Sequence, residues 1–104
     1  EIFDFLTEHN IEGVVLMSAD RHRSDAWKIE RPGDYALYEF NSSRLTNHHT
    51  HPVMKEALFS YNKTPSFGLV EIDTTVPDPT IRYTVIAING QRMHSMELKR
   101  SELE

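Results

Sequence analysis

The sequence predicts a mixed α/β fold class, in which a short helix and one buried strand precede a mostly antiparallel, β-rich part. Apolar residues recur at helical spacing within residues 2–9, and the apolar run Val14–Met17 follows directly behind Gly13. The dipeptide Asn89-Gly90 separates two alternating segments, which is the strongest short signal for a β-hairpin. These features place a helix and a strand first and a sheet that ends in a hairpin last.

Length, charge and composition bound the function. A chain of 104 residues suits a single domain, which we divide into a helix–strand–loop part (1–30) and a β-rich part with the terminal hairpin (31–104). A net charge of −5 lacks the basic footprint that binding to nucleic acid requires, and no apolar run approaches the roughly 20 residues of a membrane span. The absence of cysteine excludes disulfides and thiolate metal ligands. Because the chain begins with Glu1 directly in a helical pattern, we expect it to be the carboxyl-terminal segment of a longer protein.

The first predicted element is a short amphipathic helix over residues 2–9, whose apolar side carries Ile2, Phe3, Phe5 and Leu6. A strand over Val14–Met17 comes next, and its unbroken apolar run is typical of a parallel or central strand that is buried on both faces. A helix followed by a strand suggests half of a β-α-β crossover whose first strand lies upstream.

A small polar corner, residues 18–22, follows this strand. Open α/β sheets bind ligands beyond the carboxyl ends of their strands, and Asp20 and His22 lie one residue apart there. A carboxylate oxygen with an imidazole nitrogen suits zinc, iron or manganese, and the oxygen also suits calcium or magnesium. The alternative is structural: Asp20 caps the next segment or pairs with Arg21 or Arg23, and His22 is simply exposed.

The middle of the chain predicts one strand and one further short helix. Residues 23–30 have mixed periodicity and indicate a helical turn or a loop. A turn at 31–34 precedes a strand at 35–40, where apolar and polar residues alternate. After a loop at 44–52, Pro52 is suited to begin a short helix that runs to residue 59.

The loop at 44–52 holds His48, His49 and His51. Three histidines in four residues can ligate a transition metal, but nothing in their spacing enforces one geometry. We therefore favour a solvated, lid-like loop near the corner, and leave open whether one of these histidines contacts metal or phosphate.

The last third predicts β structure throughout. Residues 66–73 have apolar side chains on both faces, so we expect an interior strand in which Gly68 marks a close backbone approach or a bulge. A two-residue hairpin loop sets the cross-strand pairs Ile81–Leu98, Arg82–Glu97, Tyr83–Met96, Val85–His94, Ile86–Met93 and Ile88–Gln91. Residues 99–104 have the composition of a frayed polar tail.

Several segments also match family motifs. Val14–His22 is similar to the strand-plus-loop VVxLSGDxH, Tyr38–Thr46 to the segment EFxSSxLT, and Tyr61–Asp73 to the strand SFGLVEID. In this order, and with a similar closing hairpin, they resemble the alkaline phosphatase D (PhoD-like) phosphodiesterase/phosphatase family, a branch of the calcineurin-like metallophosphoesterases. Ala19 stands where that family usually has glycine. If that glycine adopts positive φ, Ala19 is strained by about 1 kcal/mol or more.

The resemblance implies a metal-dependent phosphoric ester hydrolase, built as an α/β-β/α sandwich. It implies that Asp20 ligates one metal ion and that His22 ligates its neighbour or binds the substrate phosphate. The charge of Arg21 suits binding of the phosphate, and the alternative is that Arg21 points to solvent. The implied ions are iron, calcium, manganese or zinc, and the implied partners are a phosphate ester substrate and the remainder of the parent domain. Because the family's other ligand loops are not among these residues, we expect the isolated chain to bind metal poorly and to show no phosphatase activity.

A second class of function stays open. The chain could be a non-catalytic β-rich interaction module, or a degenerate relative without metal, that binds a partner through a sheet edge or the histidine-rich loop. Aspartate-, asparagine- and histidine-bearing loops upstream would favour the enzyme, and their absence would favour the module.

Overall fold

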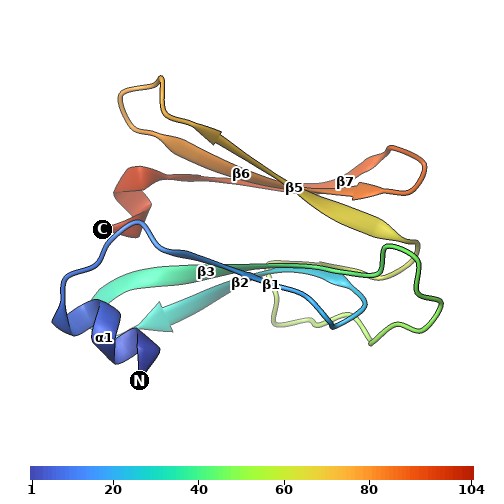
Figure 1. Ribbon diagram of the computed structural model, residues 1–104, viewed down its shortest axis with the longest axis horizontal. Coiled ribbons are helices and arrows are strands. Elements are labelled where there is room, and N and C mark those ends of the chain that lie inside the picture. Colours follow the sequence, from blue (N-terminus) through green and yellow to red (C-terminus); the bar gives the residue numbers. More distant parts are fainter.

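The computed structural model describes residues 1–104 and contains one short α-helix and two β-sheets, which face each other as layers with the helix at one end (Figure 1). The elements are α1 (Ile2–Glu8), β1 (Val15–Ser18), β2 (Ser24–Arg31), β3 (Asp34–Ser42), β4 (Phe59–Tyr61), β5 (Ser66–Asp73), β6 (Thr80–Ala87), β7 (Arg92–Lys99) and the 3₁₀ helix η1 (Arg100–Leu103). The chain is therefore a mixed α/β-type domain that is mostly β.

The first sheet has the strand order β1-β3-β2-β4, in which β1 is parallel to β3 and the other neighbours are antiparallel. The parallel pairing of β1 is as predicted, but β1 lies at the edge of its sheet and Met17 is 71% exposed, so burial on both faces is wrong. The helical turn or loop predicted at 23–30 is also wrong. These residues form β2, because β3 and β4 pair with both of its edges and bury Ser24–Ala26.

The helix α1 has the predicted bounds within one residue, but it buries only Leu6. Ile2 and Phe5 are 72% and 52% exposed, so most of the predicted apolar side is open to solvent. The predicted turn at 31–34 is confirmed, with Gly33 at φ 78° between β2 and β3.

The second sheet is an antiparallel meander in the order β5-β6-β7. β5 has the predicted bounds, but it is an edge strand, and Ile72 is 67% exposed. The hairpin register is confirmed from Ile81–Leu98 to Val85–His94, after which Ile86 lies opposite Arg92 instead of Met93. The register changes because the hairpin loop is longer than two residues. In this loop only Gly90 has positive φ, and its N–H donates to the carbonyl of Ala87.

Two segments differ from the sequence prediction in opposite directions. Residues 52–58 form an irregular segment with a turn at 55–56 and no helix, because so short a segment needs a buried face to be stable and Leu58 is 51% exposed. Residues 99–104 are ordered where a frayed tail was predicted. Leu103 is 4% exposed, and its carbonyl accepts the N–H of Gly13 at 2.8 Å, which ties η1 to the segment before β1.

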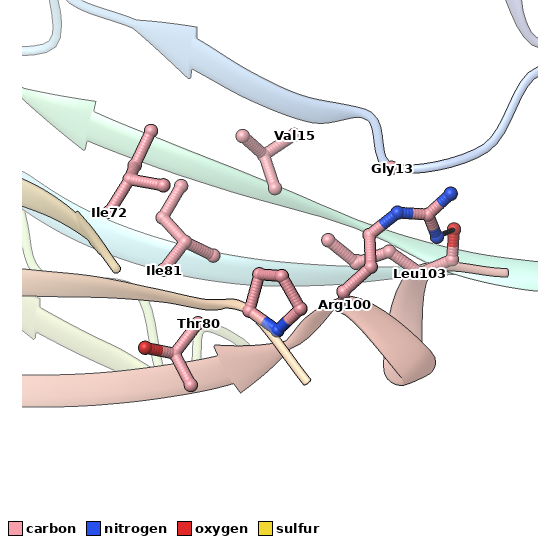
Figure 2. A pocket seen from close by; sticks show the side chains of 8 residues that line it. Gly13, Val15, Ile72, Thr80, Ile81, Arg100 and Leu103 are labelled. Carbon is pink, nitrogen blue, oxygen red and sulfur yellow. Dashed lines mark hydrogen bonds between the residues drawn. The ribbon is translucent and has the colours of Figure 1, made fainter. Parts of the chain in front are cut away.

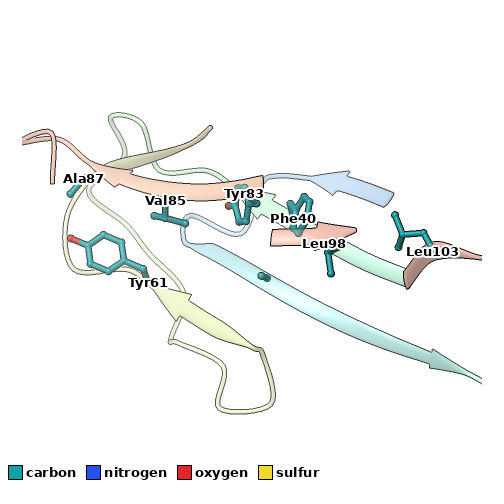
Figure 3. Close-up of a cluster of buried hydrophobic side chains, with 8 residues drawn as sticks. Phe40, Tyr61, Tyr83, Val85, Ala87, Leu98 and Leu103 are labelled. Carbon is teal, nitrogen blue, oxygen red and sulfur yellow. The ribbon is translucent and has the colours of Figure 1, made fainter. Parts of the chain in front are cut away.

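The core lies between the two sheets. The ring of Tyr83 on β6 stacks on Phe40 of β3 at 4.6 Å between centroids and on Phe59 of β4 at 5.9 Å. Its hydroxyl donates to the carbonyl of Asn41 at 2.8 Å, so one side chain joins both sheets. Figure 3 shows the cluster around it, which comprises Ala26, Phe40, Tyr61, Tyr83, Val85, Ala87, Leu98 and Leu103.

We predict that Gly68→Ala destabilises the chain by roughly 3 kcal/mol, the upper end of the usual cost of overpacking. A Cβ at Gly68 would lie 2.4 Å from Cε2 of Tyr83 and 3.0 Å from Cβ of Ser42, and the stacked ring has no room to move. Chemical denaturation measures the cost. The control is Gly33→Ala, where no atom lies within 4 Å and only the positive φ costs about 1 kcal/mol; equal costs for the two variants would contradict the prediction.

Asp78 generates a prediction about pH. Its carboxylate accepts the Ser101 hydroxyl at 2.6 Å and the Ser101 N–H at 3.0 Å, and these hydrogen bonds hold its pKa below the ordinary value. A depressed pKa in the folded state means that this stabilisation is complete above the unfolded pKa of about 3.9 and is lost as the pH falls through the folded pKa. Between pH 6 and pH 3 the unfolding free energy of Asp78→Asn should therefore fall less than that of the wild type. Parallel pH profiles would refute this role.

Candidate metal-binding corner

The corner, residues 18–22, joins the carboxyl end of β1 to β2 and lies at the end of the first sheet away from α1 (Figure 1). Asp20 and His22 both adopt left-handed backbone conformations, with φ of 72° and 51°. Ala19 is not among the residues with positive φ, so the strain considered for it is absent. The left-handed positions are instead taken by aspartate and histidine, which tolerate them better than most residues.

Apart from Ser18, whose hydroxyl donates to Glu39 at 2.5 Å, the polar side chains of the corner are not used for hydrogen bonds or ion pairs. Asp20 and Arg21 are exposed, and the ion pairs and hydrogen bonds within the chain involve neither side chain. The alternative in which Asp20 pairs with Arg23 does not occur, because Arg23 pairs with Asp25. His22 is half-buried, and its Nδ1 atom is buried without a hydrogen-bond partner. A carboxylate, a guanidinium and an imidazole are thus left available at the corner.

A buried ion pair anchors the corner to β2. Nε of Arg23 donates to Asp25 at 2.6 Å, and these side chains are 10% and 0% exposed. Asp25 also accepts the Ser60 hydroxyl at 2.5 Å and the Trp27 indole N–H at 3.4 Å. Because the Asp25 carboxylate is paired and hydrogen-bonded, it supports the adjacent backbone and is not itself available to a ligand.

The histidine-rich loop lies against the corner. The Thr50 hydroxyl donates to the carbonyl of His22, and the ring of His22 lies 5.7 Å from that of His49 and 6.0 Å from that of His51, between centroids. His48 is exposed and its ring takes no part in this group. The sequence indicated both the corner and the loop. Their contact joins residues at least 27 positions apart, and local sequence patterns cannot predict such a contact.

Whether the corner could bind a metal ion depends on the side chains that have no partner within the protein. No group of three or more histidine, aspartate or glutamate side chains is already arranged around one point. Asp20 and His22 nevertheless offer an unpaired carboxylate and an unpartnered imidazole nitrogen, which suit the predicted ions. These residues therefore fit the group as two ligands of a larger set.

A separate apolar pocket of ≈ 180 Å³ lies at the other end of β1 (Figure 2). Val15, Ile81 and Leu103 are among its lining residues, and it contains no carboxylate or imidazole. It is therefore not part of the corner.

No protein-family model, curated protein or solved structure matches this chain. None of its helices has the length and apolar character that crossing a bilayer requires.

The buried ion pair carries a stability prediction. Asp25→Asn should cost about 3–5 kcal/mol in unfolding free energy, because it leaves the Arg23 guanidinium buried without a counter-charge. If the variant does not fold, the double variant Arg23→Met/Asp25→Leu should recover much of the loss, since it removes both charges. The control is Glu30→Gln in the exposed pair with Lys28, which should leave the denaturation midpoint unchanged. An Asp25→Asn midpoint equal to that of Glu30→Gln would contradict the anchoring role.

Proposed function

We propose that this chain is the carboxyl-terminal segment of a metal-dependent phosphoric ester hydrolase of the alkaline phosphatase D type, within a metallophosphoesterase sandwich, and that it supplies the last metal-ligand loop. The observation that carries the proposal is the corner after the parallel strand β1. There Asp20 and His22 are held in left-handed conformations while their side chains make no hydrogen bond or ion pair within the chain. The ordered motif resemblance over Val14–His22, Tyr38–Thr46 and Tyr61–Asp73 supports the same function.

Each residue of the corner has a chemical role in this proposal. The Asp20 carboxylate and a ring nitrogen of His22 would hold metal, and the exposed Arg21 guanidinium would bind a phosphate oxygen and orient the ester. Bound metal supplies charge neutralisation of the phosphate and activation of a water for in-line displacement. The Arg23–Asp25 pair positions the corner without touching substrate.

The test is hydrolysis by the full-length protein that contains this chain. Asp20→Ala and His22→Ala should each lower kcat/KM for p-nitrophenyl phosphate or bis-p-nitrophenyl phosphate at least about a hundredfold, which is ~2.7 kcal/mol of transition-state stabilisation. The isolated 104-residue chain should hydrolyse neither ester. Using a monoester and a diester also identifies the substrate class.

Glu30→Gln is the matched control, because it alters an exposed carboxylate on β2 outside the corner. It should retain wild-type kcat/KM. Full activity in the Asp20→Ala/His22→Ala double variant, with an unchanged circular dichroism spectrum, would refute the hydrolase assignment.

One observation also fits a second candidate, the non-catalytic interaction module. Large apolar side chains are exposed on α1 and at the tip of the hairpin, with Ile2 and Ile88 each 72% exposed. In the hydrolase the remainder of the parent domain would cover them, whereas in the module a separate protein would do so. Metal-ligand loops upstream in the full-length protein favour the hydrolase, and their absence favours the module.

A further inference from the structure

Three imidazole rings from two distant segments meet beside the corner. His22 comes from the turn before β2, and His49 and His51 come from the loop between β3 and β4. Their ring centroids are separated by 5.3 Å (His49–His51), 5.7 Å (His22–His49) and 6.0 Å (His22–His51), so each ring contacts both others. A close triangle of this kind does not follow from the histidine-rich composition of the loop, because His48 in the same loop stays outside it.

The triangle is slightly larger than that of three histidines that share one ion, and the three rings as they stand do not form a group that could hold one. Three imidazoles bound at zinc–nitrogen distances of about 2.0–2.1 Å with tetrahedral angles have ring centroids about 5 Å apart. The shortest separation here is 5.3 Å and the longest is 6.0 Å. Because His49 is exposed and lies outside regular structure, rotation of its side chain can bring its ring nitrogen toward the other two rings.

None of the three rings is occupied by another group of the protein. The hydrogen bonds made by His22 and His51 use their backbone carbonyls, as acceptors from Thr50 and Asn62, and leave the rings free. Nδ1 of His22 is buried and has no partner. A buried imidazole nitrogen without a partner is costly, and a metal ion would satisfy it.

The loop that carries two of the rings is held in place from both sides. The Thr50 hydroxyl donates to the carbonyl of His22, and Nδ2 of Asn62 donates to the carbonyl of His51 at 3.1 Å. Nε of Arg44 donates to the carbonyl of Asn47 at 3.2 Å on the other side of the loop. These bonds use backbone carbonyls and side-chain donors, so they fix the loop backbone next to the corner while the imidazoles stay available.

We propose that His22, His49 and His51 form a three-imidazole site that binds one divalent transition-metal ion of the zinc class in this chain alone. Neutral nitrogen ligands suit Zn²⁺, Ni²⁺ and Cu²⁺ and disfavour Ca²⁺ and Mg²⁺. The two added imidazoles reverse the expectation that the isolated chain binds metal poorly, which counted only Asp20 and His22. The site stands whether or not the full-length protein hydrolyses phosphate esters.

The test is zinc binding to the 104-residue chain at pH 7.5, by isothermal titration calorimetry with ZnCl₂. The wild type should bind one Zn²⁺ per chain. His22→Ala, His49→Ala and His51→Ala should each weaken binding by more than about tenfold, since loss of a ligand costs more than loss of a residue that merely supports one. His48→Ala is the matched control from the same loop and should bind within about twofold of the wild type.

A second measurement needs no variant. In the wild type, Zn²⁺ should shift the ring ¹⁵N resonances of three histidines and leave those of His9, His48 and His94 in place, so a variant that fails to fold does not remove the test. Failure of the wild type to bind Zn²⁺ overturns the site, and so does an equal loss in His48→Ala, because that indicates a diffuse histidine-rich loop. If zinc binds as proposed but the full-length protein hydrolyses neither ester, only the hydrolase assignment fails.

Discussion

The ring of Tyr83 is the contact through which the two sheets hold each other. It stacks on Phe40 and Phe59 of the first sheet, and its hydroxyl donates to the carbonyl of Asn41. Burial raises the pKa of the Tyr83 hydroxyl above its ordinary value, because the phenolate would be desolvated, so the group stays a neutral donor. The ring needs space on its other side, and Gly68 of β5 provides it by having no Cβ.

The Tyr83 contact is connected to the corner by residues that lie opposite one another in the first sheet. Asn41 lies opposite Ser18 on β1 and opposite Asp25 on β2, and Asp25 in turn lies opposite Ser60 on β4. A row of polar residues therefore crosses all four strands directly beneath the corner, and the Tyr83 hydroxyl is bonded to the backbone of that row. Asp25 accepts hydrogen bonds from Ser60 in the same row and from Arg23, which lies just before β2. The corner is thus fixed at both ends, at Ser18 and at the Arg23–Asp25 pair.

The sequence could predict those features that a local pattern determines. The bounds of β5 follow from a run with apolar residues on both faces, the pairing of β6 with β7 from an Asn-Gly pair, and the turn before β3 from a Pro-Gly pair. Sheet position could not be predicted, because β1 and β5 have interior compositions yet lie at edges, and apolar residues alone do not report how many neighbours a strand has. The 3₁₀ helix η1 is ordered because Leu103 packs at the end of the core. The three histidine rings come together where the Thr50 hydroxyl bonds to the carbonyl of His22. Both are long-range contacts.

The backbone of the corner supports a role that packing alone does not explain. Left-handed conformations at non-glycine residues cost of order 1–3 kcal/mol each, and Asp20 and His22 adopt them within three residues. The Thr50 hydroxyl bonds to the carbonyl of His22, but the two side chains gain no partner from these conformations, because Asp20 is exposed with no hydrogen bond and the buried Nδ1 of His22 has no partner. The buried Arg23–Asp25 pair is not an efficient way to gain stability either, since an apolar pair of similar size serves as well. What the pair and the row beneath it do provide is a fixed backbone at the corner, from which the Asp20 carboxylate and the His22 imidazole project without a hydrogen bond. An unpaired carboxylate and imidazole on such a backbone are what the proposed metal-binding role requires.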